Sequence, residues 1–167
     1  QFYFGRISAS RVTEANKFFI QTRYSFNKAK FTLSDGEEVS SENRRTNTFA
    51  QYVISINDHW SAGARTSFGQ SSFGNTDFEF VFKPAIEYNI YPYSENQTRR
   101  FSFMYSVGPQ FRDYTELTIF DRMEETRWQQ GLDIDYGLTQ KWGDINFSIE
   151  FDQYMHDMSL FSIEFNP

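Results

Sequence analysis

The sequence predicts an all-β fold, an antiparallel up-and-down transmembrane β-barrel, and three observations support this. Residues 77–93 alternate apolar or aromatic with polar side chains over a length well above the roughly 5–6 residues of an ordinary strand. Aromatic residues make up 20% of the chain, with 20 Phe and 10 Tyr, yet the mean hydropathy is −0.63. No apolar run approaches the ~18 residues of a membrane helix. A wall between lipid and a polar interior combines these features.

Length, charge and cysteine content narrow the class of protein. The chain has 167 residues, which suits a single β-barrel domain over residues 1–167. It carries 22 acidic against 16 basic residues, a net charge of −6, so no basic stripe exists to neutralise the phosphates of a nucleic acid. Because cysteine is absent, disulfides, thiol chemistry and Cys-based zinc sites are excluded.

In the first half of the chain, alternation with a period of two predicts four strands. Two of them cover residues 2–12 and 17–33, and the connection at 13–15 joins them. Residues 34–45, rich in Asp, Glu, Ser and Asn, are expected to form a long polar loop. Two more strands follow over 46–56 and 60–70. They are joined by the segment Asn57-Asp58-His59, because Asn and Asp tolerate the backbone angles of a tight turn.

The second half of the chain predicts five more strands. After a loop at 71–76 come strands over 77–93, which ends at Tyr91-Pro92-Tyr93, and over 99–114. A loop at 115–125 precedes a seventh strand, which the turn at 140–143 separates from an eighth. The connection 156–159 leads to a short ninth strand over 160–165. Pro84 and Pro109 each remove a backbone donor inside a strand, so a β-bulge is expected at both.

The connections alternate between short and long, as do the periplasmic turns and outer loops of outer-membrane barrels. The short ones lie at 13–15, 57–59, 92–97 and 140–143, and several aromatic residues lie beside them in a predicted interfacial girdle. The side chains expected to face lipid or to lie in this girdle are Trp60, Phe80, Phe82, Tyr88, Tyr91, Tyr93 and Trp142. In this arrangement the first strand starts at the outer surface, whereas such barrels start in the periplasm with an even number of strands. We therefore expect the chain to be part of a larger even-stranded barrel, incomplete at both ends.

Four stretches of sequence together resemble a known family. They are 57–63 (NDHWSAG), 84–94 (PAIEYNIYPYS), Asp113-Tyr114, and Trp142-Gly143 after a tight turn. They resemble Bacteroidetes outer-membrane β-barrel proteins described as salt-induced outer-membrane proteins, a domain of unknown function. The resemblance covers most of the chain and rests on turn and girdle motifs. It implies a β-barrel in the bacterial outer membrane and leaves any activity open.

The polar face of the predicted strands carries charges of both signs, which are expected to face the lumen. They are Arg23, Arg65, Glu79, Lys83, Glu87, Arg100, Arg112, Arg127, Asp133, Asp135, Glu150 and Asp152. Charges inside a barrel either pair with one another or are wetted by a channel. A network of salt bridges that fills a narrow lumen is the favoured interpretation, and a conducting pore is the alternative. The number of strands decides between them, since small barrels are filled by their side chains.

Sites for chemistry are sparse, and we expect no catalytic residue, metal or cofactor. His59 and His156 are the only histidines, which excludes a multi-histidine metal site. The acidic stretch 35–38 lacks the alternating ligands of a calcium loop. One alternative function is a rim-located outer-membrane hydrolase using His156, with Asp113 and Ser159 as candidate partners.

A second alternative is a soluble, lipocalin-like ligand-binding barrel, which needs the Phe and Ile stripes to face inward. The favoured function is a non-enzymatic, structural or pore-forming component of the bacterial outer membrane, or a subunit of an envelope complex. The expected partners are the lipid bilayer with its lipopolysaccharide and other envelope proteins, and not nucleic acid.

Overall fold

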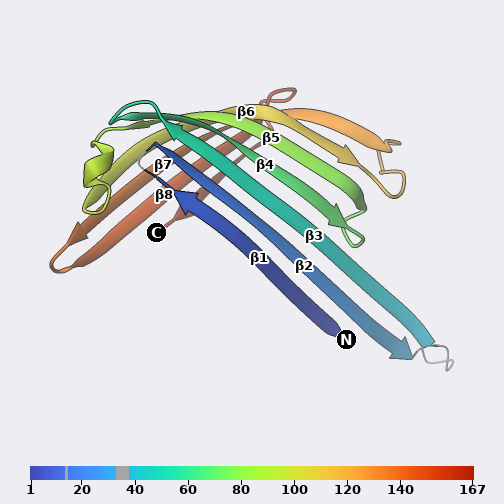
Figure 1. Ribbon diagram of the computed structural model, residues 1–167. Helices are drawn as coiled ribbons and strands as arrows, with labels where there is room; N and C mark the ends of the chain where they lie inside the picture. Colours follow the sequence, from blue (N-terminus) through green and yellow to red (C-terminus); the bar gives the residue numbers. More distant parts are fainter. Residues whose placement is uncertain (14, 33–37) are drawn as a thin grey trace.

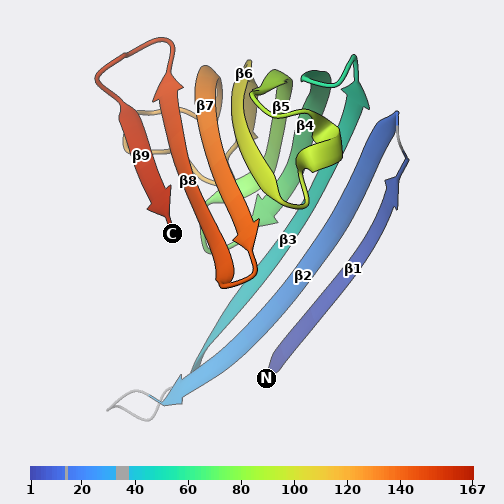
Figure 2. The ribbon, with the colours of Figure 1, turned by 90° about the vertical axis from the view of Figure 1, so that its left-hand side faces the viewer.

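A computed structural model describes residues 1–13, 15–32 and 38–167, and its nine strands form one antiparallel sheet in chain order (Figure 1). This confirms the all-β, up-and-down arrangement. The sheet is open, with β1 and β9 as its two edges (Figure 2). The strands are β1 (Phe2–Val12), β2 (Asn16–Thr32), β3 (Glu38–Ser55), β4 (Trp60–Ser71), β5 (Thr76–Asn89), β6 (Arg99–Asp113), β7 (Glu124–Gln140), β8 (Gly143–Tyr154) and β9 (Phe161–Asn166).

The predicted polar loop at 34–45 is wrong over residues 38–45, which belong to β3. Here β2 and β3 continue as a paired ladder as far as Thr32 opposite Glu38. The hairpin does not need an apolar face in this part because backbone hydrogen bonds and cross-strand charge pairs stabilise it. Lys28 Nζ, for example, lies 2.5 Å from Glu42 Oε1. The rest of the predicted loop, and most of the acidic stretch 35–38, lies outside the described residues.

The fifth strand ends earlier than predicted, at Asn89 instead of Tyr93. The chain leaves the sheet and forms a 3₁₀ helix, η1 (Tyr93–Glu95), directly after Pro92. The backbone N–H of Tyr93 donates to the carbonyl oxygen of Asp58 over 2.9 Å, which ties this connection to the β3–β4 turn. Proline fixes φ and has no N–H, so the alternation of 90–93 does not continue the ladder.

The two strand prolines interrupt the ladder but do not form the predicted bulges. In the β5–β6 pair the register is the same on both sides, with Val81 opposite Gln110 and Ala85 opposite Ser106, so neither strand gains a residue. The residues between these pairs, 82–84 and 107–109, have no ladder partners across the β5–β6 seam, although 82–84 stay paired with β4 and 107–109 with β7. The register shift of the sheet lies instead in the β4–β5 pair, between Gly69 and Ser71.

The sheet is strongly curved, and side-chain contacts identify its concave face. Arg65 on β4 lies 3.1 Å from Asp133 on β7, and Lys83 on β5 lies 3.0 Å from Asp152 on β8. Each pair joins strands that are three positions apart in the sheet. Such contacts form only where side chains converge, so the face that carries these charges is the inside of the arch (Figures 1 and 2).

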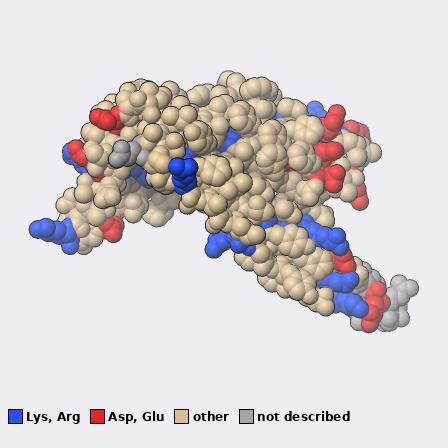
Figure 3. Space-filling view, viewed as in Figure 1, with Lys and Arg blue, Asp and Glu red and all other residues tan. Residues whose placement is uncertain are grey.

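The burial of side chains is inverted relative to a soluble protein. Among the described residues, Met104 is the only buried hydrophobic side chain, whereas Ser61, Asn89, Ser102, Ser106 and Glu125 are buried and polar or charged. Large apolar side chains are exposed along every strand, from Phe2 at 67% to Phe165 at 63%. In the view of Figure 3 most of the visible surface is uncharged, and charged residues gather toward the ends of the strands.

Candidate functional site

The candidate site is the concave face, where the twelve predicted charged side chains lie together. Residues that are direct ladder partners point to the same face of a sheet. The row Arg23, Asn47, Gly69, Glu79, Arg112 and Glu125 runs through six consecutive strands, and the other charges follow in parallel rows. The sequence thus predicted which charges share a face. It did not show which of them meet.

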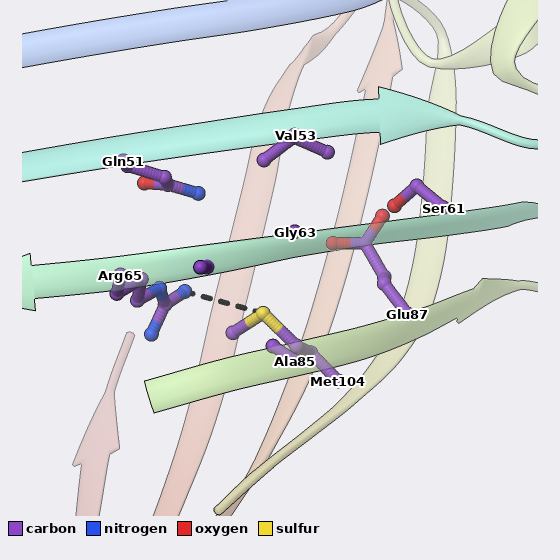
Figure 4. Close-up of a pocket in the computed structure, with 9 residues that line it drawn as sticks. Gln51, Val53, Ser61, Gly63, Arg65, Ala85, Glu87 and Met104 are labelled. Carbon is purple, nitrogen blue, oxygen red and sulfur yellow. Dashed lines mark hydrogen bonds between the residues drawn. The ribbon is translucent and has the colours of Figure 1, made fainter. Parts of the chain in front are cut away.

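Two ion pairs cross the hollow of the arch, Arg65–Asp133 and Lys83–Asp152. Arg65 also lies 3.4 Å from the sulfur of Met104 on β6 (Figure 4). The side chains of Asp133 and Lys83 are 17% and 18% exposed, whereas their partners Arg65 and Asp152 are 36% and 47% exposed, so one side chain of each bridge is largely buried. These contacts fill the centre of the concave face with paired charges.

Other charges pair between neighbouring strands. Arg112 lies 2.7 Å from Glu79, and Arg100 lies 3.4 Å from Asp135. Within β7 itself, Arg127 pairs at 2.7 Å with Glu125, whose side chain is only 5% exposed.

Two glutamines extend this network, and the sequence analysis did not single them out. Gln110 donates to the carboxylate of Glu79, and Gln129 donates to Gln110 over 2.6 Å. Alternation identified both as polar-face residues at most, because the partner of a glutamine depends on the register of the neighbouring strand.

Glu87 has no ion partner among the described residues but accepts hydrogen bonds. Asn89 Nδ2 donates to it over 2.7 Å, and the Tyr93 hydroxyl donates over 3.3 Å. Tyr93, predicted in the lipid-facing girdle, therefore directs its hydroxyl to the concave side, because η1 folds back toward the arch. Burial raises the pKa of this hydroxyl above its ordinary value.

A small cavity lies beside these groups, lined by residues that include Ser61, Gly63, Arg65, Glu87 and Met104 (Figure 4). Its volume is about 20 Å³, the space of roughly one water molecule. This part of the concave face is closely filled by side chains.

Four of the predicted lipid-facing or girdle side chains, Trp60, Phe80, Phe82 and Tyr88, lie on the opposite, convex face. Trp60 packs on Tyr88 with ring centroids 4.8 Å apart, and Phe80 packs on Phe68 at 5.0 Å. Phe82 alternates in the same direction as Phe80. A lipocalin-type barrel would need these stripes inside, and the sheet curves the other way.

Two predicted girdle aromatics lie in connections at the short-turn end. Trp142, in the β7–β8 turn, is 68% exposed. The guanidinium carbon of Arg99 lies 4.3 Å from the ring centroid of Tyr91, a cation–π contact.

The proposed rim triad is not assembled in the described structure. The hydroxyl and the backbone N–H of Ser159 both donate to the carboxylate of Asp157, over 2.7 and 3.0 Å. These two hydrogen bonds lower the pKa of Asp157. The His156 ring packs edge-on against Tyr154, with centroids 5.5 Å apart. Asp113 is a ladder residue opposite Phe78 and Glu124.

The second histidine, His59, lies in the β3–β4 turn. Its Nδ1 is 2.8 Å from the carbonyl oxygen of Asn89, which therefore accepts a hydrogen bond from the ring. Within residues 1–13, 15–32 and 38–167, no group of three His, Asp or Glu side chains has an arrangement suited to a metal ion.

Comparisons with protein-family models, with curated proteins and with solved structures find no match to this chain. The family resemblance of the four stretches therefore stays a prediction. No helix in the described part of the chain is long and apolar enough to cross a membrane.

Proposed function

We propose that the chain forms the wall of a β-barrel in the bacterial outer membrane, as a structural or pore-forming component. The inverted burial carries this proposal. Among the described residues the sheet has one buried hydrophobic side chain and exposes large apolar side chains on every strand, so this part of the chain has no solvent-excluded core in water. Lipid against the convex face would cover the apolar surface that the fold leaves open.

Strand length and charge placement support the same proposal. A tilted transmembrane strand needs about 9–11 residues. Except for the six-residue β9, the strands of this sheet have 11–18 residues. On the convex face of the β2–β3 hairpin, the aromatic residues Tyr24 and Phe26 are followed by Lys28, with Arg44 opposite Phe26 and Glu42 opposite Lys28. This change from aromatic to charged side chains is what one boundary of a lipid-facing band requires.

Between the two modes of action, the contacts favour a filled lumen over an open pore. Arg65 and Lys83 are each engaged by a carboxylate from a strand three positions away, and the cavity beside Arg65 has room for about one water. In this proposal the chain's partners are membrane lipids, with lipopolysaccharide in the outer leaflet, and other envelope proteins.

Migration on a detergent gel, with and without heating, tests the membrane barrel. Folded outer-membrane barrels resist the detergent until they are heated, so the full chain in micelles is expected to give two bands that interconvert on boiling. A single band at every temperature, together with solubility without detergent, would refute the membrane barrel. Planar-bilayer recording then separates the two modes, since a filled lumen predicts no stable conductance steps.

A further inference from the structure

Two pairs of like charges lie at opposite edges of the concave face. Arg6 on β1 stands directly opposite Arg23 on β2. Glu150 on β8 stands directly opposite Glu164 on β9. Like charges at directly opposed positions of an antiparallel pair destabilise it. Each edge of the sheet thus carries an unfavourable contact, and the two contacts have opposite sign.

None of these four side chains takes part in an ion pair within the described structure. Five other ion pairs engage basic residues of the concave face between β4 and β7, namely Arg65, Lys83, Arg100, Arg112 and Arg127. Asp133, the ladder neighbour of Glu150, is already bound to Arg65. The unpaired charges of these two edge pairs are therefore basic at the β1 edge and acidic at the β9 edge.

The tilt of the strands places the two pairs at similar depth. When the register from Arg65 is followed from strand to strand, it leads to Gln129 on β7. Arg65 nevertheless pairs with Asp133, which lies four residues farther along β7. Lys83 is offset from Asp152 in the same sense, but by two residues over three strands, so the two contacts give an offset of about four to eight residues over six strands, as in a sheared barrel. The register from Arg23, followed in the same way to β8, leads to a point eight residues from Glu150, and β8 is six strands from β2. This separation lies within the offset expected for side chains at equal depth.

We propose that the Arg6–Arg23 pair and the Glu150–Glu164 pair face each other across the lumen and form a four-charge cluster when the wall is closed. The inference rests on the proposed barrel and extends its filled lumen. Each pair is unfavourable while the edges are apart and is neutralised when they approach. Closure therefore adds a further set of cross-lumen ion pairs to Arg65–Asp133 and Lys83–Asp152, and it neutralises the like charges at the two edges of the sheet.

Reversal of one pair at a time tests this inference without changing the local repulsion. In Arg6→Glu/Arg23→Glu, two like charges again oppose each other on β1 and β2, so the loss of stability comes from charges elsewhere, apart from the hydrogen bond that Arg23 donates to Gln21. We expect the temperature at which the folded band converts on a detergent gel to fall by roughly 5 °C. The reciprocal variant Glu150→Arg/Glu164→Arg should fall similarly, and the quadruple variant should return close to the original temperature.

Equal conversion temperatures for all four proteins would overturn the charge cluster while leaving the barrel intact. Absence of any heat-dependent conversion in the unchanged protein would instead refute the proposed barrel. An independent measurement uses Arg23→Cys/Glu150→Cys, in a chain that has no other cysteine. A short bifunctional thiol reagent should cross-link this pair within one molecule. It should not cross-link the control pair Ile20→Cys/Ile149→Cys, whose side chains lie on the convex face, and equal cross-linking of both pairs would contradict the inference.

Discussion

Replacement of Arg65 by methionine is the most direct perturbation of the concave face. It removes the guanidinium that lies 3.1 Å from Asp133 and keeps a side chain of comparable length. Asp133, only 17% exposed, then has no counter-charge from β4, while Glu150 stands directly opposite it on β8. The folded state should lose stability because a largely buried carboxylate is left unpaired.

The size of the effect follows from the exposure of the pair. Exposed ion pairs contribute about 0–1 kcal/mol, and breaking a fully buried pair costs about 3–5 kcal/mol. With Arg65 36% and Asp133 17% exposed, we expect about 2 kcal/mol, or a fall of roughly 4–8 °C in the unfolding midpoint for a chain of this size. The control Arg100→Met breaks a 3.4 Å pair whose side chains are 47% and 34% exposed, and it should cost less than about 1 kcal/mol.

Thermal unfolding in detergent micelles, followed by circular dichroism, measures these differences. Asp133→Asn and the double variant Arg65→Met/Asp133→Asn complete a double-mutant cycle, which should return a coupling energy of about 1–2 kcal/mol. Effects of Arg65→Met and Asp133→Asn that simply add, or an Arg65→Met midpoint equal to that of Arg100→Met, would refute the cross-lumen bridge.

Three further predictions concern backbone packing, pH and lipid contact. A Cβ on Gly63 would overlap the carbonyl oxygen of Tyr52, so Gly63→Ala should lower the free energy of unfolding by about 2 kcal/mol. In the control Gly5→Ala the added Cβ has no atom within 4 Å, so this variant should unfold at the same temperature as the unchanged protein. Hydrogen bonds from Ser159 hold the pKa of Asp157 below 3.8, so their stabilisation is present at neutral pH and is lost as pH falls through that lowered value. Ser159→Ala should raise the pKa measured by carboxyl NMR titration, and an unchanged pKa would contradict this. All three tryptophans are exposed, so brominated lipids should quench their fluorescence, and a signal insensitive to them would count against lipid contact.

The alternation of side chains was sufficient to predict nine strands and the face on which each charge lies, because pleating alone determines both. Alternation failed where a strand is polar on both faces and where an aromatic pattern continues beyond the end of a strand. Residues 38–45 are polar on both faces, so hydrophobic periodicity gave no signal there, and cross-strand pairs such as Lys28–Glu42 stabilise the strand instead. The prediction for Tyr91 and Tyr93 failed in the opposite sense, since the aromatic pattern continues past Asn89, where the strand ends.

The pairing of charges could not be predicted from the sequence because it depends on curvature and tilt. Arg65 has Lys83 as its direct ladder partner, a like charge, and each is neutralised by an acid three strands away. Nothing in the local sequence of β4 indicates a partner on β7. The same holds for Gln110 and Gln129, whose contacts follow from register rather than from residue type.

The long β2–β3 hairpin has a consequence for how insertion of the chain can be followed in a cell. Its strands have 17 and 18 residues, several more than a bilayer crossing requires. Its far part carries Lys28 and Lys30, paired at the surface with Glu42 and Glu38. In the proposed membrane arrangement these amines stand clear of lipid on one side only. An impermeant amine reagent or an antibody against this hairpin would therefore report, in intact cells, which side of the membrane the hairpin faces.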